Sequence, residues 1–185
     1  MERFDYQKKW DEKELNKFTR DDFKHLTVDE TTIQFLATTG LPDNTAPFVS
    51  FDRKELRTIK EIYSTDNPDD NFLVDIGSDG AGDPICIDIQ NNCKIVALDH
   101  EDNFTPRFVN SSVRELFAFL TIYKDFGDKL RQLRGDDAFI DSNFTDSELN
   151  ELLGHLKSVD NQALENNDTF WSREIETLKA NRFVQ

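Results

Sequence analysis

The chain has 185 residues, of which 37 are Asp or Glu and 22 are Lys or Arg, so its formal net charge is -15 at pH 7. Such a charge repels phosphate backbones and anionic lipid headgroups, which argues against binding of nucleic acid or a membrane surface. Hydrophobic residues make up 37% of the chain and include 16 Phe, which excludes a disordered chain and predicts one domain with an aromatic-rich core.

Neither a secretory leader nor a membrane span is predicted. The first ten residues, MERFDYQKKW, mix charges of both signs and contain no apolar stretch. The longest apolar-rich run covers residues 116–123, which is far short of the about 20 residues that cross a bilayer. We therefore expect a cytoplasmic protein.

The two cysteines, Cys86 and Cys93, are too few for a disulfide framework. If Asn91 and Asn92 form a tight turn, Cys86 faces Ala97, and the thiols lie roughly 13 Å apart along the strands. A disulfide needs Cα atoms within about 7 Å. Reduced, half-buried thiols are expected, in keeping with a reducing compartment.

Two helices are expected ahead of the strands. The first is predicted over about residues 8–18. The second begins at a capping box, Thr27 to Glu30, in which Thr27 accepts from first-turn amides and Glu30 reaches back. Gly40, in the left-handed conformation, and Pro42 end this helix.

Four strands are predicted in the middle of the chain, over residues 47–51, 71–77, 85–90 and 93–98. The third alternates Ile with other residues in the period-2 pattern of a half-buried strand. The fourth returns after the two-asparagine turn, so that Val96 and Leu98 are expected on the same face as the isoleucines. The strands therefore predict an antiparallel meander with one apolar face.

Three helices are predicted after the strands. Ser112 to Glu115 forms a second capping box, and the apolar stripe behind it runs to Tyr123 and is expected to cover the sheet. Thr145 to Glu148 forms a third box, ahead of a stripe that ends at Leu156. The last helix is expected over about residues 170–180.

A polar segment, residues 135–143, is predicted to be a loop between two parts of the chain. Residues 1–135 would form an α+β domain in which a curved antiparallel sheet packs against helices. Residues 136–185 would form a helical C-terminal extension packed on the same domain. No internal repeat is visible.

Acidic residues gather in two parts of the chain. Residues 66–102 contain ten Asp and Glu against one Lys, and residues 136–185 contain eleven against four Lys and Arg. The remainder is close to neutral. Clustering on loops around one sheet favours a face that binds a basic partner, while a solvated surface that only maintains solubility is the alternative.

The most distinctive stretch is residues 75–84, DIGSDGAGDP. As a calcium loop that starts at Asp75 it lacks a ligand at Gly77 and has Cys86 where a bidentate Glu belongs. No Gly-Lys-Ser/Thr follows, and a strand rather than a helix comes next, which excludes a P-loop and a dinucleotide fingerprint. A glycine-rich turn, in which Asp side chains accept from backbone amides, is expected.

A second stretch, Asp99-His100-Glu101-Asp102, follows a predicted strand. A His between carboxylates suits a general base or a metal ligand. Phe104 stands four residues after His100, where a zinc-protease pattern needs a second His, and no nucleophile with a paired base is evident. An acidic strand end in solvent is the expectation, and no cofactor is predicted.

Taken together, these motifs resemble a SUKH-superfamily domain. Residues 35–42 (FLATTGLP) and 48–51 (FVSF) resemble its opening. Residues 76–88 (IGSDGAGDPICID) resemble its strand pair rich in Gly and Asp. Residues 99–101 (DHE) and 110–116 (NSSVREL) resemble its later strand end and closing helix.

The resemblance covers residues 27–123, about half the chain, and implies a curved sheet covered by helices. Many members of the superfamily are immunity proteins, which bind and neutralise toxins used in competition between bacterial cells, and others are interaction modules. No shared catalytic set comes with the resemblance.

We therefore expect a binding protein and not an enzyme. Its partner would be a basic toxin domain, such as a nuclease, and the chain would be a monomer or a homodimer. The expected partner-binding residues are Asp79, Asp83, Asp99, Glu101 and Asp102. The alternatives are a scaffold or regulatory module without a toxin partner, and a metal-dependent hydrolase that uses Asp75, Asp83 or His100.

Overall fold

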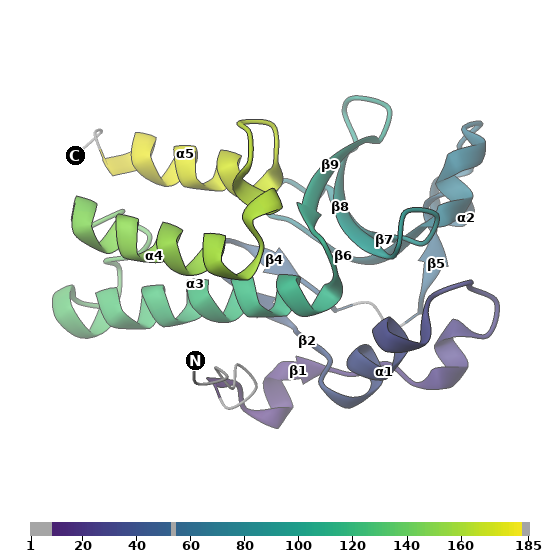
Figure 1. Cartoon of the computed structure of the whole chain (residues 1–185), viewed down its shortest axis with the longest axis horizontal. Coiled ribbons are helices and arrows are strands. Elements are labelled where there is room, and N and C mark those ends of the chain that lie inside the picture. The colour runs from purple at the N-terminus through teal and green to yellow at the C-terminus, as the bar shows by residue number, and fades with distance from the viewer. Residues whose placement is uncertain (1–8, 53–54, 183–185) are drawn as a thin grey trace.

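The computed structural model describes residues 9–52 and 55–182, and these form a mixed fold in which helices pack against antiparallel strands (Figure 1). The predicted α+β class is confirmed. The helices are α1 (Glu30–Thr38), α2 (Ile59–Tyr63), α3 (Val113–Arg134), α4 (Asp146–Val159) and α5 (Phe170–Arg182). The strands are β1 (Leu15–Asn16), β2 (Leu41–Pro42), β3 (Asn44–Thr45), β4 (Val49–Ser50), β5 (Arg57–Thr58), β6 (Leu73–Ser78), β7 (Pro84–Asp88), β8 (Lys94–Asp99) and β9 (Thr105–Asn110).

The helix predicted over residues 8–18 is wrong, and Lys8 lies outside the described residues. A 3-10 turn at Glu12–Glu14 leads directly into β1, which pairs with β2. The apolar residues that suggested a helix enter the core from extended chain instead. Trp10, for example, is buried against α3 and donates from Nε1 to the Thr121 hydroxyl over 2.8 Å.

The second helix is present as α1, but its cap is Asp29 and not Thr27. The Asp29 carboxylate accepts from the Thr32 amide at 3.0 Å. Both residue types suit a cap, and only the folded chain decides between them. The expected termination is confirmed, since Gly40 has a φ of +80° just beyond the helix.

The larger sheet has the strand order β3-β4-β6-β7-β8-β9 over the described residues, with β5 also paired to β6. Three of the four predicted strands, those over residues 71–77, 85–90 and 93–98, correspond to β6, β7 and β8. The remaining predicted strand, over residues 47–51, is present only as the short β4. The sequence did not predict β9, which forms the far edge of the sheet. Figure 1 shows that β8 and β9 bend strongly, as expected for a curved sheet.

The register of the hairpin between β7 and β8 differs from the prediction by one residue. Cys86 lies opposite Val96 and not Ala97, because the turn is longer than two residues and includes Asn92 and Cys93, both with positive φ. A shift of one residue moves a strand's side chains to the opposite face. Val96 and Leu98 therefore do not share the isoleucine face.

The sheet is buried on both faces. Ile85, Ile87 and Ile95 belong to the main core on the side of α3. Cys86, Val96 and Leu98 form a second cluster on the other side, with Ile59 of α2 and Leu73. Both cysteines are reduced thiols, as expected, but they are fully buried rather than half-buried. Burial raises the pKa of the Cys93 thiol to about 11.

A β-bulge in β6 brings β4 into the sheet. The register of the β6–β7 pair shifts between Asp75 and Gly77, and the Asp75 carboxylate accepts from the Gly77 amide at 3.1 Å. A Cβ at position 77 would lie 2.3 Å from the Ser50 carbonyl oxygen. Gly77 is therefore required for the close approach of β4.

The helices after the sheet begin where the sequence predicts. Ser112 caps α3 by accepting from the Arg114 amide, and Thr145 and Glu148 form the expected box at α4. α3 has 22 residues. It is therefore much longer than the helix expected from an apolar stripe that ends at Tyr123. Residues 135–143 contain neither helix nor strand. None of the helices in the described ranges is both long and apolar enough to cross a bilayer.

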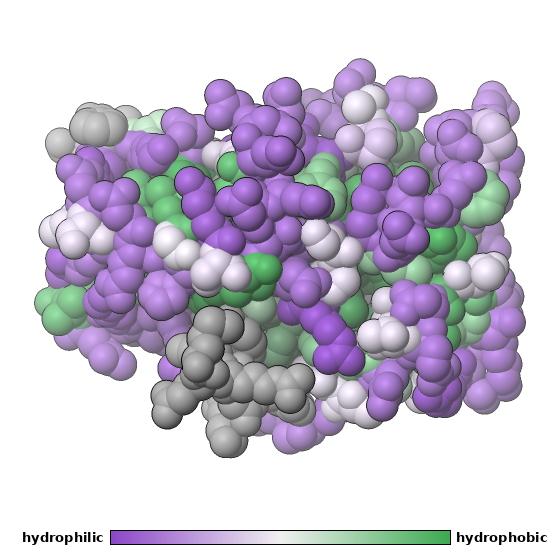
Figure 2. Space-filling view, in the orientation of Figure 1, coloured by the Kyte–Doolittle hydropathy of each residue, from purple (hydrophilic) through white to green (hydrophobic). Residues whose placement is uncertain are grey.

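The C-terminal helices share the main core with the sheet and α3. Trp171 of α5 is fully buried, and its ring lies 5.1 Å from Phe119 and 5.0 Å from Tyr123, between centroids. Its indole Nε1 donates to Asn110 at the end of β9 over 2.9 Å. Figure 1 shows α3, α4 and α5 side by side along one flank of the sheet. In the same orientation, hydrophilic residues cover most of the visible surface (Figure 2).

Candidate functional site

Four of the five expected binding residues lie on two turns at one end of the sheet, and the fifth, Asp99, is the last residue of β8. The β6–β7 turn covers residues 79–83, and the β8–β9 turn covers residues 100–104. Since β6, β7, β8 and β9 form an antiparallel meander, alternate turns fall at the same end. The sequence separates the two turns by about twenty residues, and the fold brings them together.

Within the β6–β7 turn, Asp79 organises the backbone. Its carboxylate Oδ1 accepts from the amides of Ala81 and Asp83, both at 2.9 Å. This confirms the expectation that Asp side chains satisfy amides in the glycine-rich loop. Burial, followed by the nearby Asp83 charge, raises the pKa of Asp79 above its ordinary value.

Asp83 joins the two turns. It is 8% exposed, and its Oδ1 accepts from the His100 amide at 3.0 Å and lies 2.6 Å from His100 Nδ1. The hydrogen bond to Asp83 raises the pKa of His100 above its ordinary value. His100 therefore does not simply extend into solvent at a strand end, as the sequence suggested. It holds one turn against the other.

The β8–β9 turn combines one structural carboxylate with two exposed ones. Asp99 accepts from the amides of Glu101 and Asp102 at 3.1 Å, and Arg107 lies 3.5 Å from its other oxygen. Glu101 and Asp102 are exposed. Their side chains therefore contribute negative charge that faces solvent.

A hollow of about 430 Å³ opens between this turn and the C-terminal part of the chain. Asp99, Asp102 and Arg107 line one side, and Asn166, Asp168 and Arg173 line the other. The arginines lie 3.5 Å from Asp99 and Asp168 respectively. Because these pairs balance locally, Asp102 supplies the net charge of the hollow.

The residues of the C-terminal side were not named from the sequence, although the acidic excess of residues 136–185 pointed toward them. α5 also brings Glu174 into range of the β6–β7 turn. Burial, followed by the charge of Asp79, raises the pKa of Glu174 to about 7. The charge of the β6–β7 turn is therefore felt at α5.

The fold brings together two of the three residues of the hydrolase alternative, Asp83 and His100. The third, Asp75, is buried in β6 and bonded to the bulge. Within residues 9–52 and 55–182, no group of three or more His, Cys, Asp and Glu side chains is arranged to hold a metal ion.

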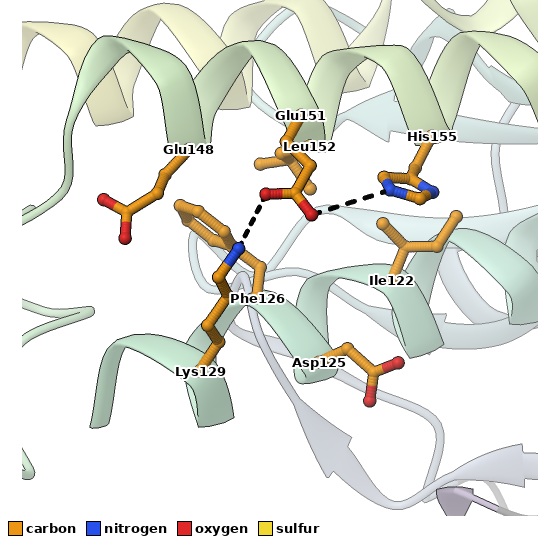
Figure 3. A pocket seen from close by; sticks show the side chains of 8 residues that line it. All are labelled: Ile122, Asp125, Phe126, Lys129, Glu148, Glu151, Leu152 and His155. Atoms are coloured by element: carbon orange, nitrogen blue, oxygen red, sulfur yellow. Dashed lines mark hydrogen bonds and ion pairs between the residues drawn. The ribbon is translucent and has the colours of Figure 1, made fainter. Parts of the chain in front are cut away.

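A second concavity, of about 230 Å³, lies between α3 and α4 (Figure 3). Its apolar lining includes Ile122, Phe126 and Leu152. Glu151 of α4 lies 2.6 Å from Lys129 Nζ and 4.0 Å from His155 Nε2. The bond to Lys129 lowers the pKa of Glu151. The ion pair of Lys129 and Glu151 thus links α3 to α4 across this concavity. None of the expected binding residues lines it.

Comparison with known families agrees with the resemblance read from the sequence. The model of the SUKH-4 immunity protein family matches residues 6–177, which extends the similarity well beyond residues 27–123 and includes the C-terminal helices. Neither the curated proteins nor the solved structures yielded a match. Since the family model covers nearly the whole chain, the chain belongs to the SUKH-4 immunity protein family.

Proposed function

We propose that this chain neutralises a toxin by placing its two acidic turns against a basic surface of the toxin domain. Membership of an immunity protein family supports the general role. The observation that carries the finer proposal is the meeting of two acidic turns through the Asp83–His100 contact. This contact presents the exposed Glu101 and Asp102 on a fixed support.

Charge complementarity explains how such a face would work. Five carboxylates, those of Asp79, Asp83, Asp99, Glu101 and Asp102, lie at this end of the sheet, so the face attracts a basic partner and accelerates its approach. A nuclease must bind phosphate, and its active-site surface is therefore basic. Carboxylates that occupy the phosphate positions would exclude the nucleic acid, which makes a nuclease toxin the class that the face fits best.

The family name and the buried thiols favour a binding role in the cytoplasm of the cell that makes the protein. Because the chain belongs to an immunity protein family, we also propose that it acts stoichiometrically and not as an enzyme.

The experiment is to express each protein encoded next to this chain's gene in turn, to identify one that arrests growth, and to co-express that toxin with the chain. Cells that express the toxin alone should stop growing, and wild-type chain should restore growth. Purified toxin and chain should form a complex in gel filtration. Growth arrest that persists at high expression of the chain would refute the proposal.

A further inference from the structure

One exposed aromatic side chain adjoins the acidic turns. Phe48 is 65% exposed, the largest exposed fraction of any described aromatic residue. It lies in the short turn between β3 and β4, where its amide donates to the Thr45 carbonyl over 2.9 Å. The position of Phe48 is therefore set by the turn and not by a loose segment.

The turn that carries Phe48 lies against the β6–β7 turn. A Cβ added at Gly80 would lie 3.1 Å from the Phe48 Cβ and 3.4 Å from its carbonyl oxygen. Gly80 directly follows Asp79, which places the aromatic ring next to the first acidic turn. Pairing of Ser50 in β4 with Ser78 in β6 holds the two turns in this arrangement.

The backbone of Phe48 adopts an unusual conformation in this position. Its φ is +86°, in the left-handed region that residues with a large side chain rarely occupy. Strained positions of this kind concentrate at functional sites. The other exposed aromatic residue near an acidic turn, Tyr63, is different because its ring packs on Phe104 at 4.7 Å between centroids.

We propose that Phe48 is the apolar anchor of the toxin-binding face. The fitting partner has an apolar pocket bordered by Lys or Arg, so that the pocket receives the ring while the basic border pairs with the acidic turns. Binding energy at protein interfaces concentrates in a few aromatic or Arg anchors surrounded by polar groups. Because the turn already sets the backbone of Phe48, binding costs little backbone conformational entropy there.

This inference rests on the proposed function and deepens it by naming the central contact. The negative surroundings of Phe48 include Asp79, which directly precedes Gly80 in the adjoining turn. Charge complementarity therefore selects a basic border for the pocket rather than an acidic one.

The test compares Phe48→Ala with Ile140→Ala by surface plasmon resonance. Ile140 is a matched control because it is also 65% exposed and lies in the loop between α3 and α4. The probe is a catalytically inactive form of the toxin that wild-type chain neutralises in the growth assay. Phe48→Ala should weaken the affinity about 30-fold or more, mainly through faster dissociation. Ile140→Ala should bind within about twofold of wild type.

A thermal melt of each variant separates lost binding from lost folding, and Phe48→Leu, which keeps apolar bulk, should retain most of the affinity. Binding of Phe48→Ala within about twofold of wild type overturns the inference while the proposed function stands. The same holds if Ile140→Ala weakens binding as much. If wild-type chain neutralises no toxin, the proposed function and this inference fall together.

Discussion

Glu174 is the residue whose surroundings oppose its charge most clearly. It lies one turn after the buried Trp171 on α5, where burial and the Asp79 charge raise its pKa to about 7. The folded chain therefore binds more protons than the unfolded chain between the ordinary Glu value and pH 7. Across this window the free energy of unfolding falls as pH rises, and above it the full penalty remains.

Glu174→Gln should raise the free energy of unfolding by about 1–3 kcal/mol at pH 8, because the amide removes the penalty of a buried charge. Near pH 4 the same substitution should have almost no effect, since the carboxyl is already protonated. Urea denaturation at both pH values measures the difference. Glu176→Gln is the control, on an exposed side chain 2.7 Å from Lys179. An equal effect of Glu174→Gln at both pH values would contradict this assignment.

His100 provides a second test at this scale. Because the bond to Asp83 raises the pKa of His100, the contact is strongest with the ring protonated, below its ordinary pKa, and weakens as pH rises through the raised value. Asp83→Asn should return the His100 pKa toward about 6.5. An NMR titration of the His100 ring protons gives the value directly, with His155 as an internal reference. An unchanged His100 pKa in Asp83→Asn would exclude Asp83 as the cause.

Helix beginnings are the elements that the sequence predicts best. Ser112 and Thr145 cap α3 and α4 as expected, because a cap is made by residues two or three positions apart and needs no tertiary contact. The full capping box is present at Thr145, whereas Ser112 accepts from the Arg114 amide. The choice between Thr27 and Asp29 shows the limit of this approach. Two cap-forming residues stand two positions apart, and the packing of α1 selects the second.

Thr145→Ala should lower the free energy of unfolding by about 1 kcal/mol, because the Glu148 amide loses the hydroxyl that accepts from it. Chemical denaturation measures the loss. Thr177→Ala, within α5, is the matched control. Its hydroxyl bonds only to the Arg173 carbonyl, and Ala has the higher helix propensity. If the two substitutions destabilise the chain equally, the cap at Thr145 contributes nothing specific.

The strands were harder to predict than the helices because their contacts are distant in the sequence. The β7–β8 register depended on the conformation of Asn92 and Cys93, and the wrong turn length placed Val96 on the wrong face. The sequence also did not predict the second core cluster, because α2 has only five residues and its apolar pattern is too short to indicate a helix. β9 was missed because its outer half is exposed and carries Pro106.

The site itself was predicted in part. The sequence supplied the acidic turns, which are local features rich in Asp and Gly. It did not supply the Asp83–His100 bond, the approach of Phe48 to Gly80 or the position of Glu174, because each joins segments that only the fold brings together. That these five carboxylates contact a partner stays a prediction.

At the scale of the whole molecule, the C-terminal helices complete the core. Asp160, at the end of α4, is 6% exposed, and its carboxylate accepts from the Ser111 amide at 2.8 Å and from the Asn110 side chain at 3.2 Å. Trp171 fills the space beside Tyr123. The division at residue 135 stays a prediction, and these contacts indicate that the first part depends on the second.

A chain truncated after residue 135 should therefore lack a cooperative unfolding transition, because removal of the C-terminal segment exposes the core side of α3. Thermal melting followed by circular dichroism tests this, with the full-length chain as the reference. Addition of the segment 136–185 as a separate peptide should restore part of the transition. A sharp transition in the truncated chain alone would show that residues 1–135 fold independently.

The measurement that tests the central claim most directly is the rate at which this chain associates with the toxin that it neutralises, measured across a series of salt concentrations. Glu101→Gln with Asp102→Asn is the informative variant, because both side chains are exposed and the hydrogen bonds of the turn come from Asp99 and the backbone. The control variant is Asp136→Asn with Asp137→Asn. These residues lie just beyond the C-terminal end of α3, and the two substitutions make the same change in charge.

If the acidic turns meet the toxin, the association rate of wild-type chain falls steeply with salt, and the Glu101/Asp102 variant associates about threefold to tenfold more slowly at low salt. The Asp136/Asp137 control should stay close to wild type. An association rate that is indifferent to salt, or equal in the two double variants, would contradict binding through the acidic turns.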